Sequence, residues 1–261
     1  MPTTGSSLAA ARVVVSDRAA VADDAMRLTH DVYVERGFAD PAPSGRRFMA
    51  PYLNPGTRFI VAYDGDEPIA TATLVADGPF GLPADRSFAE EVDQARADAN
   101  TLCEVTGLAV ASSWRGHTRL VLGLVLGTAV RLNGQYGAGH RAVYVVEPRQ
   151  AALMSRVLIG ERRYGPRPLL GSPGTLVVTQ DFSRYRTFYA DPTGPAARRL
   201  VGEYALDPEP TWLIDEPQSG GWRQVLLPEL VEESGLLSRL ERQLGLLHGA
   251  RDALPTPAIV I

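Results

Sequence analysis

The sequence contains no lysine: all 26 of its basic residues are arginine. This absence excludes any chemistry that needs a lysine amine within the chain, such as a Schiff base, a pyridoxal phosphate linkage or a P-loop lysine. Cysteine is nearly absent as well. Because Cys103 is the only one, no internal disulfide or thiolate cluster can form.

Long apolar runs and a strong charge of either sign are also missing. No segment approaches the roughly 20 apolar residues of a membrane span, and the start, "MPTTGSSLAAAR", lacks the apolar centre of a signal peptide. The formal net charge of -4 gives no reason to expect nucleic acid or an anionic membrane as a partner. We therefore expect a cytoplasmic protein with no membrane span, no nucleic-acid partner and no metal.

Apolar residues make up 45% of the 261 residues, which is enough for a sizeable core. Periodicity and turn signals predict alternating strands and helices. The expected strands are 12–16, 58–65, 68–76, the strand around Glu104, 141–146 and 174–182. The expected helices are 19–36, 85–97, 119–136, 149–158 and 228–247, and Asp17 is expected to cap the first of them.

This order predicts an α/β fold with a mixed sheet and helices on both faces. The "DGDE" between the second and third strands indicates a hairpin. Proline and glycine become frequent near the end of the chain. We therefore expect one domain over residues 1–190, followed by an irregular and helical C-terminal extension over residues 191–261.

The stretch "CEVTGLAVASSWRGHTRLVLGLVLG" (Cys103–Gly127) reads as a strand, a loop and a helix. Strand alternation places Glu104, Thr106, Leu108 and Val110 on one face. A carboxylate held on a rigid strand can accept a proton directly or through water. The alternative is a salt bridge between Glu104 and one of the many arginines.

The loop that follows this strand is a candidate phosphate site. Unpaired amides at a helix N-terminus suit an anion, and Arg115, Gly116, His117 and Thr118 add a charge, a close backbone approach and a hydroxyl. An ordinary turn capped by Thr118, with His117 as a surface residue, is the alternative. Glu147, at the end of a later strand, is either a site residue or a solvated carboxylate.

The strand, Arg-Gly loop and long helix resemble motif A of the GNAT acyl-CoA N-acyltransferase fold. More specifically, the chain resembles the N-acyl-amino-acid synthase branch, which is related to the acyl-homoserine-lactone synthases. The matching stretches are "DVYVERGF" (Asp31–Phe38), "GLPADRSFAEEVDQAR" (Gly81–Arg96), "CEVTGLAV" (Cys103–Val110) and "LIGERRYGPRPLLGSPGTLVV" (Leu158–Val178).

The resemblance implies a mostly antiparallel, splayed sheet that holds an acyl-CoA or acyl-phosphopantetheine donor in its gap. It implies that Glu104 deprotonates an attacking amine and that backbone amides near Val110 polarise the thioester carbonyl. Tyr164 is a candidate acid for the leaving thiolate. Further residues are expected to contact the substrates: Tyr33, Glu35, Thr106 and Glu147.

The chain also departs from the family pattern. Thr118 and Leu120 occupy two glycine positions of motif A, so a phosphopantetheine on an acyl-carrier protein, with one phosphate, suits the loop better than a complete CoA. Met154 stands where many relatives have the tyrosine that protonates the thiolate. Gln150 stands where this branch often has histidine.

These observations favour an enzyme that transfers a medium or long acyl chain from a thioester to the amine of an amino acid or small molecule. A short-chain acetyl-CoA acetyltransferase and a catalytically silent GNAT-fold binding subunit are the alternatives. The Leu-rich amphipathic helix predicted over 228–247 either packs on its own domain or forms a homodimer contact.

Overall fold

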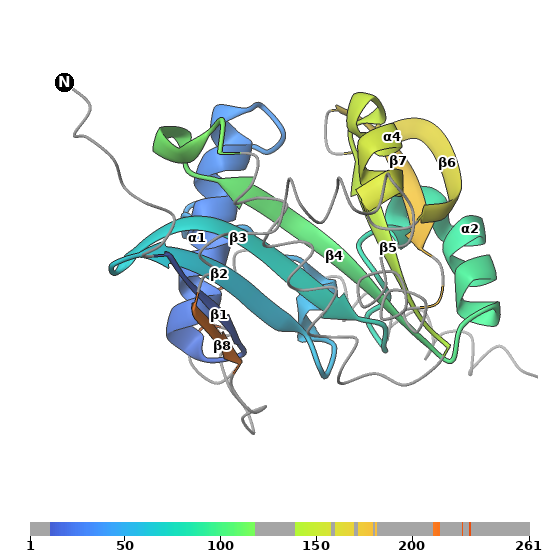
Figure 1. Ribbon diagram of the computed structural model, residues 1–261, viewed down its shortest axis with the longest axis horizontal. Coiled ribbons are helices and arrows are strands. Elements are labelled where there is room, and N and C mark those ends of the chain that lie inside the picture. Colours follow the sequence, from blue (N-terminus) through green and yellow to red (C-terminus); the bar gives the residue numbers. More distant parts are fainter. Residues whose placement is uncertain are drawn as a thin grey trace, which may run out of the picture.

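The computed structural model describes residues 11–117, 139–157, 160–169, 172–179, 181, 211–214, 226 and 230. Eight strands form one sheet in the order β6-β7-β5-β4-β3-β2-β1-β8 (Figure 1). The strands are β1 (Ala11–Ser16), β2 (Arg58–Asp64), β3 (Glu67–Ala76), β4 (Thr101–Val110), β5 (His140–Val146), β6 (Gly160–Leu169), β7 (Ser172–Thr179) and β8 (Thr211–Ile214). The helices are α1 (Ala19–Glu35), α2 (Asp85–Ala97) and α4 (Pro148–Val157), with short 3₁₀ turns η2 (Ala50–Leu53) and η3 (Ser112–Trp114).

The sheet is mixed and mostly antiparallel, as the sequence predicts. Only β4–β5 and β1–β8 run parallel among the described strand pairs. The predicted hairpin joins β2 and β3. Its turn contains Gly65 at φ +61°, a left-handed conformation that glycine adopts without strain.

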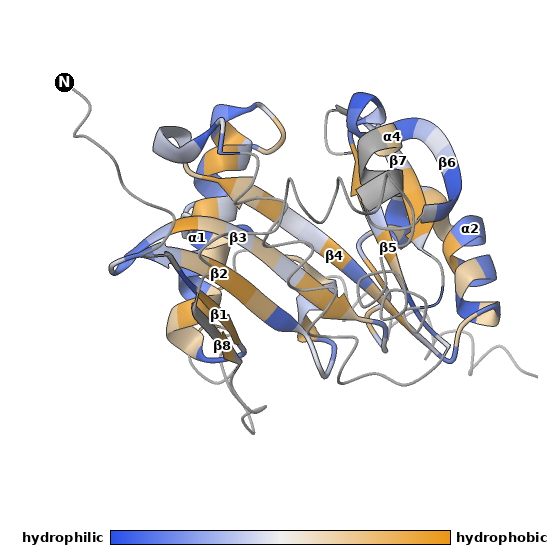
Figure 2. Ribbon diagram, viewed as in Figure 1, coloured by the Kyte–Doolittle hydropathy of each residue, from blue (hydrophilic) through white to orange (hydrophobic). Residues whose placement is uncertain are grey.

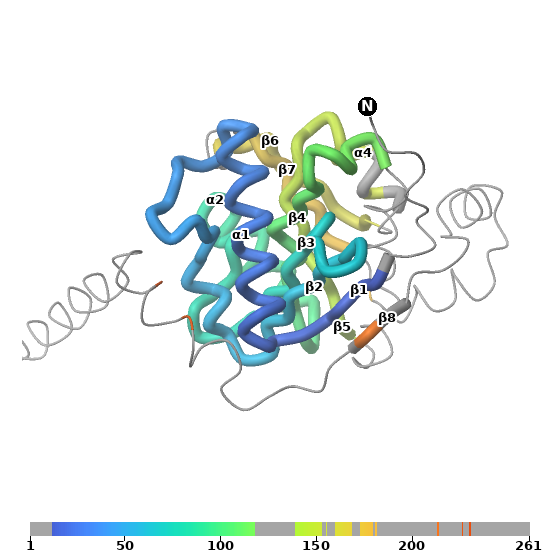
Figure 3. Tube along the Cα trace, turned by 90° about the vertical axis from the view of Figure 1, so that its left-hand side faces the viewer, coloured from blue at the N-terminus to red at the C-terminus, as the bar shows by residue number. Residues whose placement is uncertain are grey.

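Helices cover both faces of the sheet. One apolar core unites residues of α1, Phe88 of α2, and inward-facing strand residues such as Phe59 and Leu176. Phe59 and Phe88 are fully buried, and burial of such a side chain stabilises the fold by roughly 1.5–3 kcal/mol. On the opposite face, α4 packs against β6 and β7. Figure 3 shows α1 and α2 on one side of the sheet and α4 on the other, and Figure 2 shows apolar residues concentrated along the central strands.

The sheet splits between β4 and β5. Their parallel pairing runs from Thr101↔His140 to Val105↔Tyr144 and stops there. Beyond it, β4 pairs with β3, whereas Val145 and Val146 pair with β7. The two strands visibly diverge in Figure 1. This opening is the splay that the resemblance implies, and it leaves room for a ligand between the two strands.

A β-bulge in β4 changes the predicted alternation of side chains. Thr106 lies opposite Thr73, but Ala109 lies opposite Thr71, so β4 carries one extra residue between them. Gly107 adopts φ +62° at this point. Residues directly opposite in a ladder share a face, so Ala109 joins the face of Glu104. The prediction that Leu108 and Val110 lie on that face is therefore wrong.

Two strands and one helix start differ from the sequence predictions. The edge strand β6 was not predicted, because its sequence "GERRYGPRPL" is rich in Arg, Gly and Pro, which an edge strand tolerates. Strand β8 lies within the stretch expected to be irregular or helical and pairs with β1. Asp17 does not cap α1, because Arg18 is the N-cap and the Asp17 carboxylate lies 3.7 Å from Arg58.

Several predictions fall outside the described residues: the helices over 119–136 and 228–247, the role of Thr118, and most of the C-terminal extension. None of the helices in the described part of the chain has the length and apolar character of a membrane span.

Candidate acyl-transfer site

Two adjoining cavities lie at the split in the sheet. The first has a volume of about 450 Å³ and lies between the diverging ends of β4 and β5, next to the loop after β4. The second has a volume of about 340 Å³ and lies under α1, the segment 47–52 and the turn 82–84. Tyr33 and Val145 line both cavities, so the two spaces meet at these residues.

The first cavity collects the residues predicted to hold the donor. Val110, Arg115, Gly116 and His117 all line it. Gly116 has φ +98° and no neighbouring atom within 4 Å of the position that a Cβ would occupy, so its backbone is open to a ligand. Glu147, predicted as a substrate contact, lines the same cavity.

Arg115 is ion-paired in this conformation. Its guanidinium donates one hydrogen bond of 2.6 Å and a second, shorter one to the two carboxylate oxygens of Glu35. The pair holds the pKa of Glu35 below its usual range and raises that of Arg115. Glu35 itself lines neither cavity, and its contact with a substrate would therefore be through Arg115.

Two backbone amides of this loop already donate hydrogen bonds to carbonyl groups within it. The His117 N–H donates to the Trp114 carbonyl at 3.2 Å, and the Arg115 N–H donates to the Ser112 carbonyl at 3.3 Å. The expectation that the His117 amide is free to bind phosphate is wrong for this conformation, because the tight turn of η3 uses it. In the described part of this loop, the Gly116 backbone and the Arg115 side chain, which is paired with Glu35, remain the candidates for the predicted anion contacts.

The second cavity contains the predicted base. Glu104 is only 1% exposed, lies on the sheet face covered by α1 and α2, and lines the cavity together with Thr106. Its Oε2 atom accepts a hydrogen bond of 2.7 Å from the Ala84 N–H. Among the described residues, no arginine forms an ion pair with Glu104, so the salt-bridge alternative has no support there.

Burial raises the pKa of the Glu104 carboxyl to about 8. The Ala84 amide acts in the opposite direction, and the charge of Asp85 adds to the increase. A carboxyl group with such a pKa exchanges its proton near neutral pH, which is the property required of a general base.

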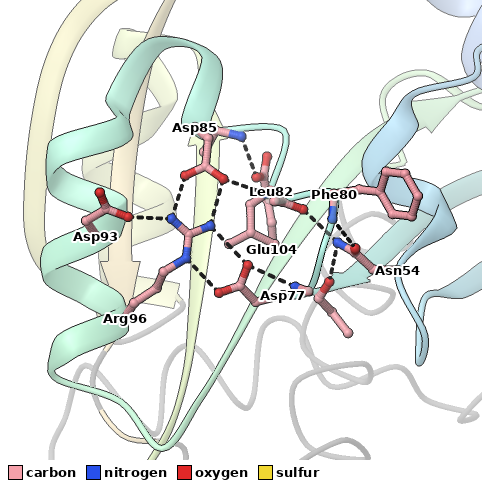
Figure 4. A network of polar contacts seen from close by, with 12 residues as sticks. Asn54, Asp77, Phe80, Leu82, Asp85, Asp93, Arg96 and Glu104 are labelled. Atoms are coloured by element: carbon pink, nitrogen blue, oxygen red, sulfur yellow. Dashed lines mark hydrogen bonds and ion pairs between the residues drawn. The ribbon is translucent and has the colours of Figure 1, made fainter. Parts of the chain in front are cut away.

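The turn that presents the Ala84 amide is fixed by a network of charges (Figure 4). The Leu82 N–H donates to the Asp85 carboxylate at 2.7 Å. Arg96 in turn donates to Asp85 and Asp77, at distances from 2.7 to 3.0 Å. This network ties the start of α2 to the end of β3 and thereby orients the hydrogen bond to Glu104.

Asn54 braces the preceding part of the same loop (Figure 4). Its amide nitrogen donates to the carbonyls of Ala76 at 2.9 Å and Gly81 at 2.6 Å, and its oxygen accepts the Phe80 N–H at 2.9 Å. Asn54 is fully buried. The sequence gives no local signal for this role, because the bonds join residues more than 20 positions apart. For Asp85, the short polar residue after "GLPA" is typical of a turn cap.

Tyr33, which was predicted to contact a substrate, lines both cavities. Burial raises the pKa of its hydroxyl, and the Arg47 guanidinium carbon lies 5.9 Å from its ring centroid. Arg47, which lines the second cavity, was not identified from the sequence. Its loop between α1 and η2 has no periodic pattern that marks it.

Tyr164 is not brought to this site. It lies on β6, lines neither cavity, and its hydroxyl donates to the Gln94 side-chain oxygen of α2 at 3.2 Å. Its ring packs at the margin of the core. The structure therefore gives no support to Tyr164 as the acid. Gln150, in contrast, lines the first cavity. Met154 lies on α4.

No group of three or more metal-ligating side chains occurs within the described ranges. What the two cavities bring together is a carboxyl group with a raised pKa, an adjoining space between splayed strands, and an arginine-glycine loop at the far end of that space. This arrangement can accept a proton from a nucleophile whose partner enters from the loop side.

Comparison with known proteins agrees with this geometry. The family model described as "N-acyl amino acid synthase FeeM" matches residues 24–179. The solved structure of FeeM, an N-acyl amino acid synthase from uncultured soil microbes, is 19% identical, with a TM-score of 0.53 over 68% of this chain and 93% of FeeM. The CoA-dependent acyl-homoserine lactone synthase BjaI, solved with SAM and isopentyl-CoA, is 16% identical, with a TM-score of 0.51 over 83% of this chain and 99% of BjaI. No curated protein matches the chain.

Proposed function

Because the chain belongs to the FeeM family of N-acyl amino acid synthases, and is thus an N-acyltransferase of the GNAT fold, we propose that it transfers an acyl group from a pantetheine thioester to the amine of an amino acid or related small molecule. The observation that carries this proposal is the pair of cavities that meet at Tyr33 and Val145. One contains Glu104 and the other leads to Arg115, so the two substrates have separate entrances and a common meeting point.

In this arrangement the amine occupies the second cavity and the thioester enters through the first. The amine nitrogen attacks the thioester carbonyl carbon, a C–N bond forms, and the C–S bond breaks. Glu104 accepts the proton that the amine loses, directly or through water, and the sulfur leaves as a thiol after protonation. The raised pKa of Glu104 supports this role, because it matches the group to the pH at which the reaction proceeds.

The donor is proposed to carry a medium or long acyl chain. A volume of about 450 Å³, walled by Leu108, Val110, Val145 and Val146, favours an apolar chain beside the pantetheine arm. Arg115 and Gly116 supply contacts for one phosphate, which supports an acyl-carrier protein as well as acyl-CoA as the source. The relative BjaI is described as CoA-dependent.

The test is a product screen by intact-mass analysis. The protein is incubated with acetyl-, octanoyl-, dodecanoyl- and hexadecanoyl-CoA and with the same chains on an acyl-carrier protein, each with a mixed pool of amino acids and amines. We expect N-acylated products with the longer chains and much less with acetyl. The matched control is Glu104→Gln. Absence of product with every donor would overturn the proposal and favour a binding protein without turnover. Equal yields from wild type and Glu104→Gln would overturn the role of Glu104 as the base.

A further inference from the structure

Arg47 is a partly buried arginine of the second cavity, and no carboxylate among the described residues forms an ion pair with it. Its backbone N–H donates to the Met26 carbonyl at 2.9 Å, which anchors the segment against α1. Its side chain lines the second cavity beside the Tyr33 ring. Its Nε atom is buried and has no hydrogen-bond partner in the described structure.

Several other arginines of the described structure form ion pairs with carboxylates. Arg46, the adjacent residue, forms an ion pair with Asp23. Arg12, Arg58 and Arg162 also contain a nitrogen without a partner, but each has a carboxylate within 4 Å, from Asp66, Asp17 and Asp98 respectively. For Arg47 no such carboxylate lies within the described residues.

A buried guanidinium nitrogen without an acceptor is costly, because it has given up its bonds to water. The planar fork of arginine matches a carboxylate, which can accept two hydrogen bonds from it. An anionic ligand in the cavity would accept the hydrogen bond that this nitrogen does not make within the described structure.

Arg47 and Glu104 line the same cavity, together with Tyr33 and Tyr52. Both groups act on the hydroxyls of Tyr33 and Tyr52, the Arg47 charge lowering their pKa and the Glu104 charge raising it. The cation and the base thus border the same small space, with the two tyrosines beside them.

We propose that Arg47 binds the carboxylate of an α-amino acid acceptor and thereby selects acceptors that carry a free carboxylate. The inference rests on the proposed function and assigns a residue to its substrate specificity. An α-amino acid carries its amine and its carboxylate on one carbon, so Arg47 holds the carboxylate while the amine faces Glu104. A peptide, an amide or a simple amine lacks this anchor.

The rest of the cavity specifies the acceptor side chain. Its walls are mostly apolar, formed by Phe48, Met49, Pro51, Leu82 and Pro83. Arg86 also lines the cavity but is exposed, so solvent balances its charge. These walls favour an acceptor with an apolar or aromatic side chain, such as leucine, over one with a charged side chain.

Acylation of leucine, leucinamide and isoamylamine tests the assignment. We compare wild type, Arg47→Gln and Arg47→Lys, with Arg163→Gln as a control at an exposed arginine of β6 that lines neither cavity. We expect wild type to prefer leucine, and Arg47→Gln to raise the KM for leucine by roughly tenfold or more, as loss of a charged hydrogen bond implies. The preference for leucine over leucinamide should shrink in Arg47→Gln, Arg47→Lys should recover part of it, and Arg163→Gln should retain it.

Titration calorimetry of leucine without a donor separates the two proposals. The assignment is supported if wild type binds leucine and Arg47→Gln does not, provided that circular dichroism shows the variant to be folded. This result does not depend on turnover. Equal use of leucine and leucinamide by an active wild type overturns it and leaves the acyl transfer standing. A higher rate with aspartate than with leucine overturns the apolar side-chain preference. If no acceptor is bound or acylated, the proposed function fails and the assignment fails with it.

Discussion

Replacement of Glu104 by glutamine is expected to change activity and stability in opposite directions. Gln is nearly isosteric, and its side-chain oxygen can still accept the Ala84 N–H that now bonds to Glu104. It cannot accept a proton. We therefore expect turnover to fall by roughly 10²–10⁴-fold, the usual share of general acid–base catalysis.

The stability change follows from the pKa of the buried carboxyl. Burial raises the pKa of Glu104 from 4.5 to about 8, so the folded state holds a proton that the unfolded state has already lost at neutral pH. The contribution of this group is most favourable below pH 4.5, decreases as the pH rises, and reaches its full penalty above about pH 8. At pH 7 the penalty is about 3 kcal/mol. Glutamine does not ionise, so the Glu104→Gln variant is free of this penalty.

Urea unfolding of both proteins at several pH values measures this difference. The variant should unfold at higher urea than wild type at pH 7, and the gap should widen towards pH 9 and close near pH 5. In parallel, the activity of wild type divided by that of the variant should rise with pH up to about 8. The titration of the amine substrate appears in both proteins and cancels in the comparison.

Two results would refute the reasoning. A variant that is less stable than wild type at neutral pH would show that the Glu104 charge stabilises the fold, as an ion-pair partner does. A well-folded variant with activity within tenfold of wild type would show that Glu104 is not the base.

Three further predictions follow from single contacts. Gly107→Ala should lower the free energy of unfolding in urea by roughly 1 kcal/mol more than Gly65→Ala does. Both positions have a left-handed φ, but only a Cβ at Gly107 meets side-chain oxygens, at 3.3 and 3.4 Å. Equal losses of stability in the two variants would contradict this reasoning. Glu35→Gln should free Arg115 and lower the KM for the donor, whereas an unchanged or higher donor KM would show that the ion pair does not compete with the donor. Burial lowers the pKa of His140 to about 4, so the contribution of this group to stability should decrease by about 3 kcal/mol as the pH falls from 6.5 to 4, opposite in sign to that of Glu104. The stability of His140→Asn relative to wild type should therefore rise by about this amount over the same pH range in urea unfolding, and an unchanged difference would contradict the assignment.

Local pattern was sufficient for the elements with strong periodicity. The helix predicted over 19–36 is α1 over Ala19–Glu35, and the one over 85–97 matches α2. Apolar spacing and capping preferences act within a few residues of each other, so a single segment contains the information. The edge strand β6 lacked that pattern, because its stability comes from pairing with β7 rather than from a buried apolar stripe.

The site residues show the same difference between segments with a clear local pattern and segments without one. Glu104 and the Arg115–Gly116 loop lie on one continuous stretch, and both line the cavities as the sequence led us to expect. Arg47 and Asn54 come from irregular segments whose position is set only by tertiary contacts. The β4 bulge likewise has no clear local signal beyond Gly107, and one extra residue was enough to reverse the predicted direction of Leu108.

That bulge has a consequence for the size of group that can approach the base. In a regular strand, the side chain two positions beyond Thr106 on the Glu104 face would be the isobutyl group of Leu108. The extra residue puts the single methyl group of Ala109 on that face instead. Because Ala109 lines the first cavity, we expect this difference of three carbon atoms to widen the passage between that cavity and Glu104. A deletion that restores a regular strand would narrow this passage without altering any charged group, and it would exclude bulky acyl chains before it affected the chemistry.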